Sequence, residues 1–279
     1  MQQAVAALLI LATTLLSPPA PGLSLLRYRR SVGETATFHV AVEIRGTQTL
    51  QDEPRVVQVR AELEVTEQTL TVESDGSFWV RVTGRVVRVT DPTGTFGTGQ
   101  YADWPAVQVR ISPLGETLET RPEPTAGQLG PFQRAFAAGM LNPAPVVLPY
   151  GGVTVGDTWQ WKQDGARQAN RLSSVTRGDR PVVRIASSGR GPVHLAEASS
   201  ALALSTTVGG EMTQHSEVDL LLPSCVVASQ KGEIHLTTQG ESVLELPTGR
   251  KSFPLSSDLR LQFRVELAGL TGQGTPGYR

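Results

Sequence analysis

Apolar and polar residues alternate with a period of two along much of the chain. In residues 57–65 the odd-numbered positions are apolar, and the positions between them are Gln, Arg or Glu. The same alternation runs through residues 259–267. Successive side chains of a β-strand point to opposite faces of the sheet, so this pattern predicts strands with one buried and one solvated face. Such strands are typical of antiparallel sheets.

Shorter alternating segments recur along the chain, and turn-forming residues separate them. The shorter segments are residues 38–44, 78–89, 107–111, 182–186, 218–222 and 233–238, and the turn signals are residues 74–76, 91–94, 177–179 and 230–232. One segment, residues 131–141, predicts a short helix. It begins at a proline and carries Phe132, Phe136 and Met140 at a spacing of four residues.

A short motif occurs twice and suggests two similar halves. Residues 31–35 read Ser-Val-Gly-Glu-Thr, and residues 154–158 read Thr-Val-Gly-Asp-Thr. Glycine supplies a positive φ for a turn, and threonine favours the start of a strand. We therefore expect a first β-rich half at residues 25–120, a connector with the short helix at 121–150, and a second β-rich half at 151–279. Two domains and one continuous sheet both remain compatible with this division.

The first 24 residues predict a signal peptide. Residues 4–16 form an apolar run, and a proline-rich segment follows it. The run is shorter than the roughly 20 residues that a membrane span needs. No Lys or Arg precedes it, whereas Arg27, Arg29 and Arg30 follow it. An uncleaved anchor and a buried strand or helix are the alternatives. The main prediction is export to the periplasm or the extracellular space, with no transmembrane span in the mature chain.

The amino-acid composition excludes some classes of binding partner. The chain has 279 residues, 39% of them hydrophobic, and a formal net charge of −1. The hydrophobic fraction is sufficient for a core, and the charge gives no basic field for nucleic acid or an anionic membrane. Cys225 is the single cysteine. It cannot form an internal disulfide, and we expect a buried, inert thiol.

The sequence contains no recognisable catalytic, cofactor-binding or metal-binding motif. The four histidines lack the usual zinc spacings. On a strand, His215, Glu217 and Asp219 would share a face and could hold a divalent metal, but a solvated face opposite Val218 and Leu220 is the favoured explanation. Glu62 and Glu64 could be considered as the carboxylate pair of a glycoside hydrolase, but neighbours two residues apart are common on the solvated face of a strand. We therefore predict no catalytic residue, no cofactor and no metal.

The residues around the second motif resemble a known signature. Leu148-Pro149, followed by Val153 and by Val155-Gly156-Asp157-Thr158-Trp159, resembles the pattern of exported bacterial β-rich proteins of unknown function. The resemblance implies an architecture similar to that of lipoprotein carriers, which is a strongly curved antiparallel sheet with an apolar concave face. The predicted fold class is therefore all-β, with one or more curved sheets built from two similar halves.

Three classes of function remain open. The first is a non-enzymatic envelope protein that binds a lipid, a lipidated protein or another apolar ligand in the concave face of the sheet. The second is a structural or protein-interaction module that uses its sheet edges. The third is a hydrolase whose site is assembled from distant residues. Trp159 and Trp161 would share one strand face, where core packing is favoured over a sugar-binding platform. The sequence does not determine the oligomeric state.

Overall fold

A computed structural model describes residues 25–50, 52–94, 104–123, 142–199, 204–246 and 249–272. This part of the chain contains eleven strands and no helix. The strands are β1 (Thr35–Leu50), β2 (Glu53–Val72), β3 (Phe78–Thr90), β4 (Trp104–Ile111), β5 (Thr117–Pro122), β6 (Thr158–Gln163), β7 (Ala166–Thr176), β8 (Val182–Ser199), β9 (Leu204–Leu221), β10 (Val226–Leu246) and β11 (Gly249–Thr271). The all-β fold class is confirmed, and the predicted helix at residues 131–141 lies outside the described residues.

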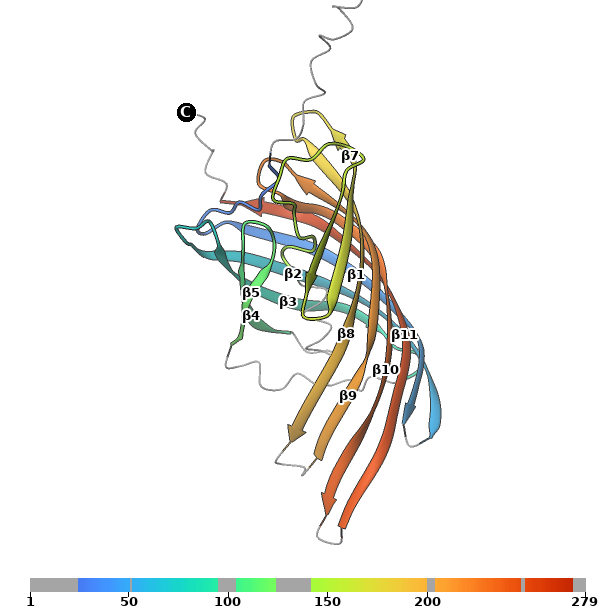
Figure 1. Ribbon diagram of the computed structural model, residues 1–279. Coiled ribbons are helices and arrows are strands. Elements are labelled where there is room, and N and C mark those ends of the chain that lie inside the picture. Colours follow the sequence, from blue (N-terminus) through green and yellow to red (C-terminus); the bar gives the residue numbers. More distant parts are fainter. Residues whose placement is uncertain are drawn as a thin grey trace, which may run out of the picture.

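All eleven strands belong to one antiparallel sheet. Their order is β5-β4-β3-β2-β1-β11-β10-β9-β8-β7-β6, so every strand neighbours the strand next to it in sequence except at the β5–β6 break. Pairing of β1 with β11 joins the two halves of the chain, with Val42 opposite Phe263. The sheet is curved and does not close (Figure 1). One continuous sheet therefore contains the strands of both halves, a point that the sequence left open.

The predicted alternation sets which face of the sheet is buried. Val57, Val59, Leu63 and Val65 on β2 are all at most 4% exposed. On β11, Leu259, Leu261, Phe263 and Val265 are buried in the same way. Together with side chains from β1, β3, β4 and β7–β10 they form one apolar cluster. This buried side of the sheet is called the inner face below, and the opposite side the outer face.

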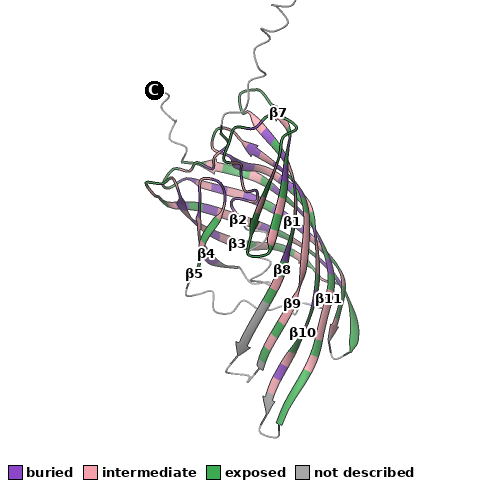
Figure 2. Cartoon of the chain, viewed as in Figure 1, coloured by how far each residue is buried: buried purple, intermediate pink, exposed green. Residues whose placement is uncertain are grey.

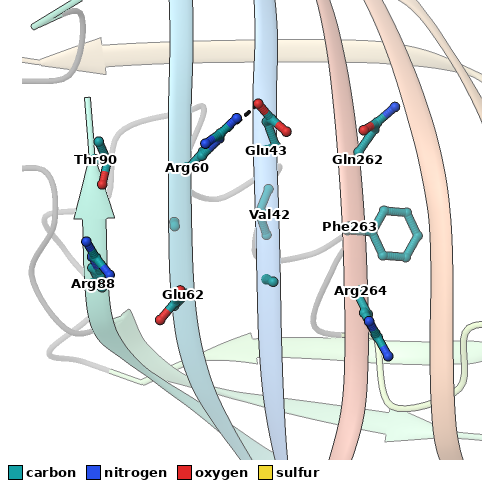
Figure 3. A pocket seen from close by; sticks show the side chains of 11 residues that line it. Val42, Glu43, Arg60, Glu62, Arg88, Thr90, Gln262, Phe263 and Arg264 are labelled. Carbon is teal, nitrogen blue, oxygen red and sulfur yellow. Dashed lines mark hydrogen bonds and ion pairs between the residues drawn. The ribbon is translucent and has the colours of Figure 1, made fainter. Parts of the chain in front are cut away.

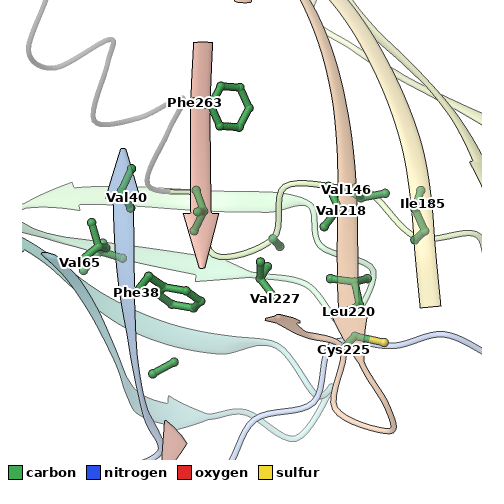
Figure 4. Close-up of a cluster of buried hydrophobic side chains, with 14 of the residues drawn as sticks. Phe38, Val40, Val65, Val146, Ile185, Val218, Leu220, Cys225, Val227 and Phe263 are labelled. Carbon is green, nitrogen blue, oxygen red and sulfur yellow. The ribbon is translucent and has the colours of Figure 1, made fainter. Parts of the chain in front are cut away.

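Side chains from both halves of the sheet meet on the inner face. Figure 4 shows Phe38 and Val65 from the first half in the same cluster as Leu220 from the second half. Residues far apart in the sequence can join one cluster in this way because the sheet curves around them. Burial of each large apolar side chain stabilises the fold by about 1.5–3 kcal/mol.

One predicted turn is wrong. Residues 230–232 lie inside β10, and the chain instead reverses at residues 222–225. Gly232 serves close packing. A Cβ there would lie 2.4 Å from the carbonyl oxygen of His215 and 2.9 Å from the ring of Phe263. The glycine therefore reports a crowded place inside a strand, which a local turn signal cannot distinguish from a true turn. The other predicted turns that we named, near residues 75, 92 and 178, separate strands as expected.

The two copies of the repeated motif form the same turn. Gly33 and Gly156 both have positive φ, of 79° and 101°. Gly33 N–H donates to the carbonyl of Thr69, and Gly156 N–H donates to the carbonyl of Leu172 in the equivalent way. Each turn thus leads into the first strand of its half and is tied to the neighbouring strand. The local equivalence is structural, while the proposed boundaries of the two halves remain a prediction.

Candidate functional site

Two segments without regular structure close one end of the inner face. They are residues 25–34, the amino-terminal segment, and residues 142–153, the inner segment. Tyr28 N–H donates to the carbonyl of Pro113 at 2.9 Å, and Leu148 N–H donates to the carbonyl of Leu114 at 2.7 Å. The Tyr28 hydroxyl donates to the carbonyl of Val146 at 2.9 Å, which joins the two segments to each other.

Side chains of β6 and β7 hold the inner segment against the sheet. Trp159 Nε1 donates to the carbonyl of Val147 at 2.7 Å, and Gln168 Nε2 donates to the carbonyl of Pro145 at 3.0 Å. Gln168 Oε1 accepts from Val147 N–H at 3.0 Å. Trp159 also packs against the core, as predicted, whereas Trp161 is not in that cluster and donates to Glu116 Oε1 at 3.4 Å. The backbone of the inner segment therefore obtains from side chains the hydrogen bonds that a strand would obtain from a neighbouring strand.

A buried ion-pair triad lies where the amino-terminal segment enters β1. Arg30 binds Glu34 at 2.8 Å and Glu67 at 3.0 Å, and these three side chains are only 2–8% exposed. Burial raises the pKa of Glu67 to about 7. The negative charge of Glu34 adds to this increase, and Arg30 partly opposes it. One cation between two buried carboxylates leaves an excess negative charge, which protonation of Glu67 removes.

The other end of the inner face is apolar and only partly covered. On β8–β11 it carries Val193, Val208, Met212, Leu236, Phe253 and Leu255, all half-buried. We call these six residues the lower inner wall. Met212 and Leu236 are cross-strand partners, and Leu259 lies opposite Leu236 on β11. Figure 2 shows intermediate residues alternating with exposed ones along these long strands, with a few buried residues among them. The wall offers an apolar surface on the inner side of the curved sheet, interrupted by the hydroxyl pairs Thr238–Ser257 and Thr206–Ser242.

The outer face is hollowed, and charged side chains line its hollows. One hollow of about 600 Å³ crosses β1–β3 and β11, and Figure 3 shows Arg60, Glu43, Glu62 and Arg88 along it. Arg60 Nε donates to Glu43 at 3.0 Å. A second hollow of about 1160 Å³ continues across β6–β11. Opposite charges already pair across the first hollow, so it is a less suitable place for an apolar ligand than the lower inner wall.

The structure places the predicted metal candidates on one outer face, as their spacing requires, but each carboxylate there has a cationic partner. Glu217 lies 2.8 Å from Lys231, and Asp219 accepts from Arg184 at 2.7 Å and from Ser229 at 3.0 Å. Hydrogen bonds from Lys231 and Arg184 lower the pKa values of Glu217 and Asp219. Within the described ranges, no three His, Cys, Asp or Glu side chains are arranged to hold a metal ion. The solvated-face explanation is the better one.

Cys225 is buried, as predicted, and burial raises the pKa of its thiol to about 11. Because the thiolate is the reactive form, we expect a thiol-specific reagent such as dithionitrobenzoate to leave the folded protein unmodified at pH 8. The same reagent should modify one thiol per chain after unfolding in urea. Rapid modification of the folded protein would show that this end of the inner face opens readily.

Sequence reasoning missed the residues that organise the inner face. The lower inner wall lies in segments rich in Gly, Ser and Thr, where period-two alternation of apolar residues is diluted. Gly210 and Gly240 pack so closely that a Cβ on either would lie 2.1 Å from a backbone oxygen. The signal that could have revealed these strands is a long alternation in which small residues such as Gly, Ser and Thr take every second position. No signal in the sequence pairs Arg30 with Glu67.

Comparisons with known proteins add little to this picture. No family model matches the chain, and no curated protein matches it. A structure described as showing lipid–protein interactions in lipovitellin is 10% identical, with a TM-score of 0.46, and the match covers 89% of this chain and 26% of that one. The chain thus spans about a quarter of the lipovitellin chain. An outer membrane channel from Pseudomonas putida F1 is also 10% identical, with a TM-score of 0.22, covering 89% and 98% of the two chains. Both scores are too low to argue function. In the described part of the chain, no helix has the length and apolar character to span a membrane.

Proposed function

We propose that this chain is a non-enzymatic exported envelope protein that binds a lipid or another apolar ligand against the inner face of its curved sheet. The observation that carries the proposal is the lower inner wall. It presents half-buried apolar side chains on the same face as the core, beyond the region that the two closing segments fill. Contact with a ligand would remove more of this surface from water, at about 25 cal/mol for each Å² buried.

The chemistry of the two faces supports a binding role. The inner face supplies shape and apolar surface, while on the outer face Arg184 of β8 and Lys231 of β10 pair with the carboxylates of β9. Export is part of the proposal and rests on the apolar run at residues 4–16. A protein outside the cytoplasm that carries a hydrophobic cargo needs such a shielded concave surface.

The direct test is native mass spectrometry of residues 25–279 purified from a bacterial periplasm. We expect a co-purifying mass that organic solvent extracts as lipid. Met212→Glu places a charge in the lower inner wall and should lower binding of a neutral apolar dye at least tenfold, because an unpaired carboxylate is costly beside an apolar ligand. Thr213 follows Met212 on β9 and lies on the outer face, so Thr213→Glu should leave binding unchanged. Equal binding by both variants would overturn the proposal.

A second function is favoured by the two edges of the sheet. Among the described residues, β5 and β6 each pair with a strand on one side only. Because successive strands in the order alternate in direction, β5 and β6 run in the same direction. An added strand from a partner would use the backbone groups of these edges. Analytical ultracentrifugation at micromolar concentrations would test it, and a dimer that Thr120→Pro dissolves is the expected result.

A further inference from the structure

A patch of uncharged polar side chains interrupts the apolar inner face. It consists of Gln168, Asn170, Ser187, Gln214 and Ser216, and we call it the polar patch. Asn170, Ser187 and Ser216 are cross-strand neighbours on β7, β8 and β9, and Gln168 and Gln214 lie in the next row, on either side of Gly189. The patch lies next to the inner segment, to which Gln168 is bound through the carbonyl of Pro145.

Two buried atoms of the polar patch have no hydrogen-bond partner among the residues that the structure describes. Asn170 is 3% exposed and Ser216 is 7% exposed, and within this part of the chain neither Asn170 Oδ1 nor Ser216 Oγ has a partner. The orientation of the Asn170 amide is fixed by its nitrogen, which donates to the carbonyl of Val147 and to Gln168 Oε1. A buried polar group without a partner costs about 1–3 kcal/mol, so each of these atoms favours a ligand that can bond to it.

The wall opposite the polar patch is apolar. In the same row of the sheet, Ser216 is followed by Gly232, Phe263 and Val42. The next row toward the lower inner wall contains Ile234, Leu261 and Ile44. The inner face at this level is therefore amphipathic, with hydrogen-bonding groups on β7–β9 and hydrocarbon on β10, β11 and β1. This arrangement fits a ligand that is itself amphipathic.

The charges around the polar patch indicate which kind of ligand head group it can bind. No ionisable side chain occupies the two rows of described residues that run through the polar patch from β6 to β1. Glu116, which accepts a hydrogen bond from Trp161, adds a negative charge nearby. An anionic head group would thus be buried without a cation, at a cost of several kcal/mol. A neutral head group that donates hydrogen bonds meets no such penalty.

From this geometry we infer that the polar patch binds the neutral, hydroxyl- or amide-bearing head of an amphiphile whose hydrocarbon chain lies on the lower inner wall. This inference rests on the proposed function. A hydroxyl of the ligand donates to Asn170 Oδ1, and a second polar group bonds to Ser216 Oγ. The ring of Phe263 lies beside Ser216, since both reach within 3 Å of the Cβ position of Gly232. Ser216 Oγ is buried, so binding requires this ring to turn aside.

The test compares three probes with 18-carbon chains on delipidated protein comprising residues 25–279. Monoolein has a neutral head with hydroxyls, oleate has an anionic head, and 1-octadecene has none. Displacement of a neutral naphthylamine dye at pH 8 measures each affinity. We expect monoolein to bind about tenfold more tightly than either of the others, which corresponds to one or two hydrogen bonds gained at buried groups.

Variants separate the head-group contact from the hydrocarbon contact. Ser216→Ala removes an oxygen that has no partner among the described residues, so the fold should be retained. It should reduce the preference for monoolein about fivefold or more, with the octadecene affinity unchanged. Ser188→Ala, on the outer face in the neighbouring row opposite His215, should change neither. If all three probes bind equally, or oleate binds best, the proposed function stands and the head-group inference is wrong. If no probe binds, the proposed function fails, and this inference fails with it.

Discussion

Replacement of Tyr28 by alanine is expected to lower the free energy of unfolding by about 3–5 kcal/mol, the range for removing a large aromatic side chain from a core. Tyr28 is 1% exposed and belongs to the apolar cluster. Its ring packs against Gly115, where a Cβ would lie 2.5 Å from it. Its hydroxyl also ties the amino-terminal segment to the carbonyl of Val146. One side chain therefore fastens both segments that close the inner face.

Tyr28→Phe is the matched control for this prediction. It retains the ring and removes only the hydroxyl, which leaves the Val146 carbonyl without this donor. We expect a loss of about 1–2 kcal/mol. Urea unfolding followed by tryptophan fluorescence measures both variants, because Trp159 is held by the neighbouring carbonyl of Val147. Equal stability of the wild type and Tyr28→Ala would mean that the amino-terminal segment does not stabilise the fold.

The sequence predicted the buried face of the individual strands but not how the strands are ordered in the sheet. The alternation in residues 57–65 and 259–267 placed the buried side chains of β2 and β11 correctly, because strand periodicity is a local property. The pairing of β1 with β11 is not local, since Phe38 and Leu267 are at opposite ends of the chain. Nothing in a single sequence sets that partnership. The curvature of the sheet was predicted only from the resemblance to exported β-rich proteins, and the order of the strands is known only from the structure.

Short signals failed where tertiary contacts decided the outcome. Gln230-Lys231-Gly232 has the composition of a turn, yet it continues a strand because the Phe263 ring needs the space that Gly232 leaves. For the candidate site, the equal spacing of His215, Glu217 and Asp219 predicted a shared face correctly. It could not predict that Lys231 and Arg184, from other strands, would pair with the two carboxylates. Partners across a sheet depend on strand order and register, which composition does not encode.

The part of the inner face that stays uncovered is also decided by contacts between residues far apart in the sequence. Residues 25–34 and 142–153 fill one end, and this leaves the lower inner wall and the polar patch as the part that a ligand can use. If the closing segments loosen, the inner face opens at that end too. Conditions that weaken the contacts of the amino-terminal segment are therefore expected to act on both stability and ligand exchange.

The pH is such a condition, through Glu67. Its carboxyl has a pKa near 7 in the folded protein, raised mainly by burial, whereas an exposed glutamate titrates near 4.5. The folded state thus holds a proton that the unfolded state loses between about pH 4.5 and 7. A group with a raised folded pKa stabilises the fold fully below its unfolded pKa, and this contribution disappears as the pH rises through the folded pKa. At about 1.4 kcal/mol for each pH unit, the loss is about 3 kcal/mol by pH 8.

Glu67→Gln tests this prediction, because glutamine resembles the protonated carboxyl and does not titrate. We expect the variant to match the wild type near pH 4.5 and to be more stable by about 3 kcal/mol at pH 8, measured by urea unfolding across this range. Glu64→Gln, on the exposed outer face of the same strand, controls for the loss of a carboxylate. Glu34→Gln removes the neighbouring negative charge, which lowers the pKa of Glu67 and reduces the loss at high pH. Parallel stability curves for Glu67→Gln and the wild type would show that Glu67 stays ionised beside Arg30, and that the triad does not couple pH to closure of the inner face.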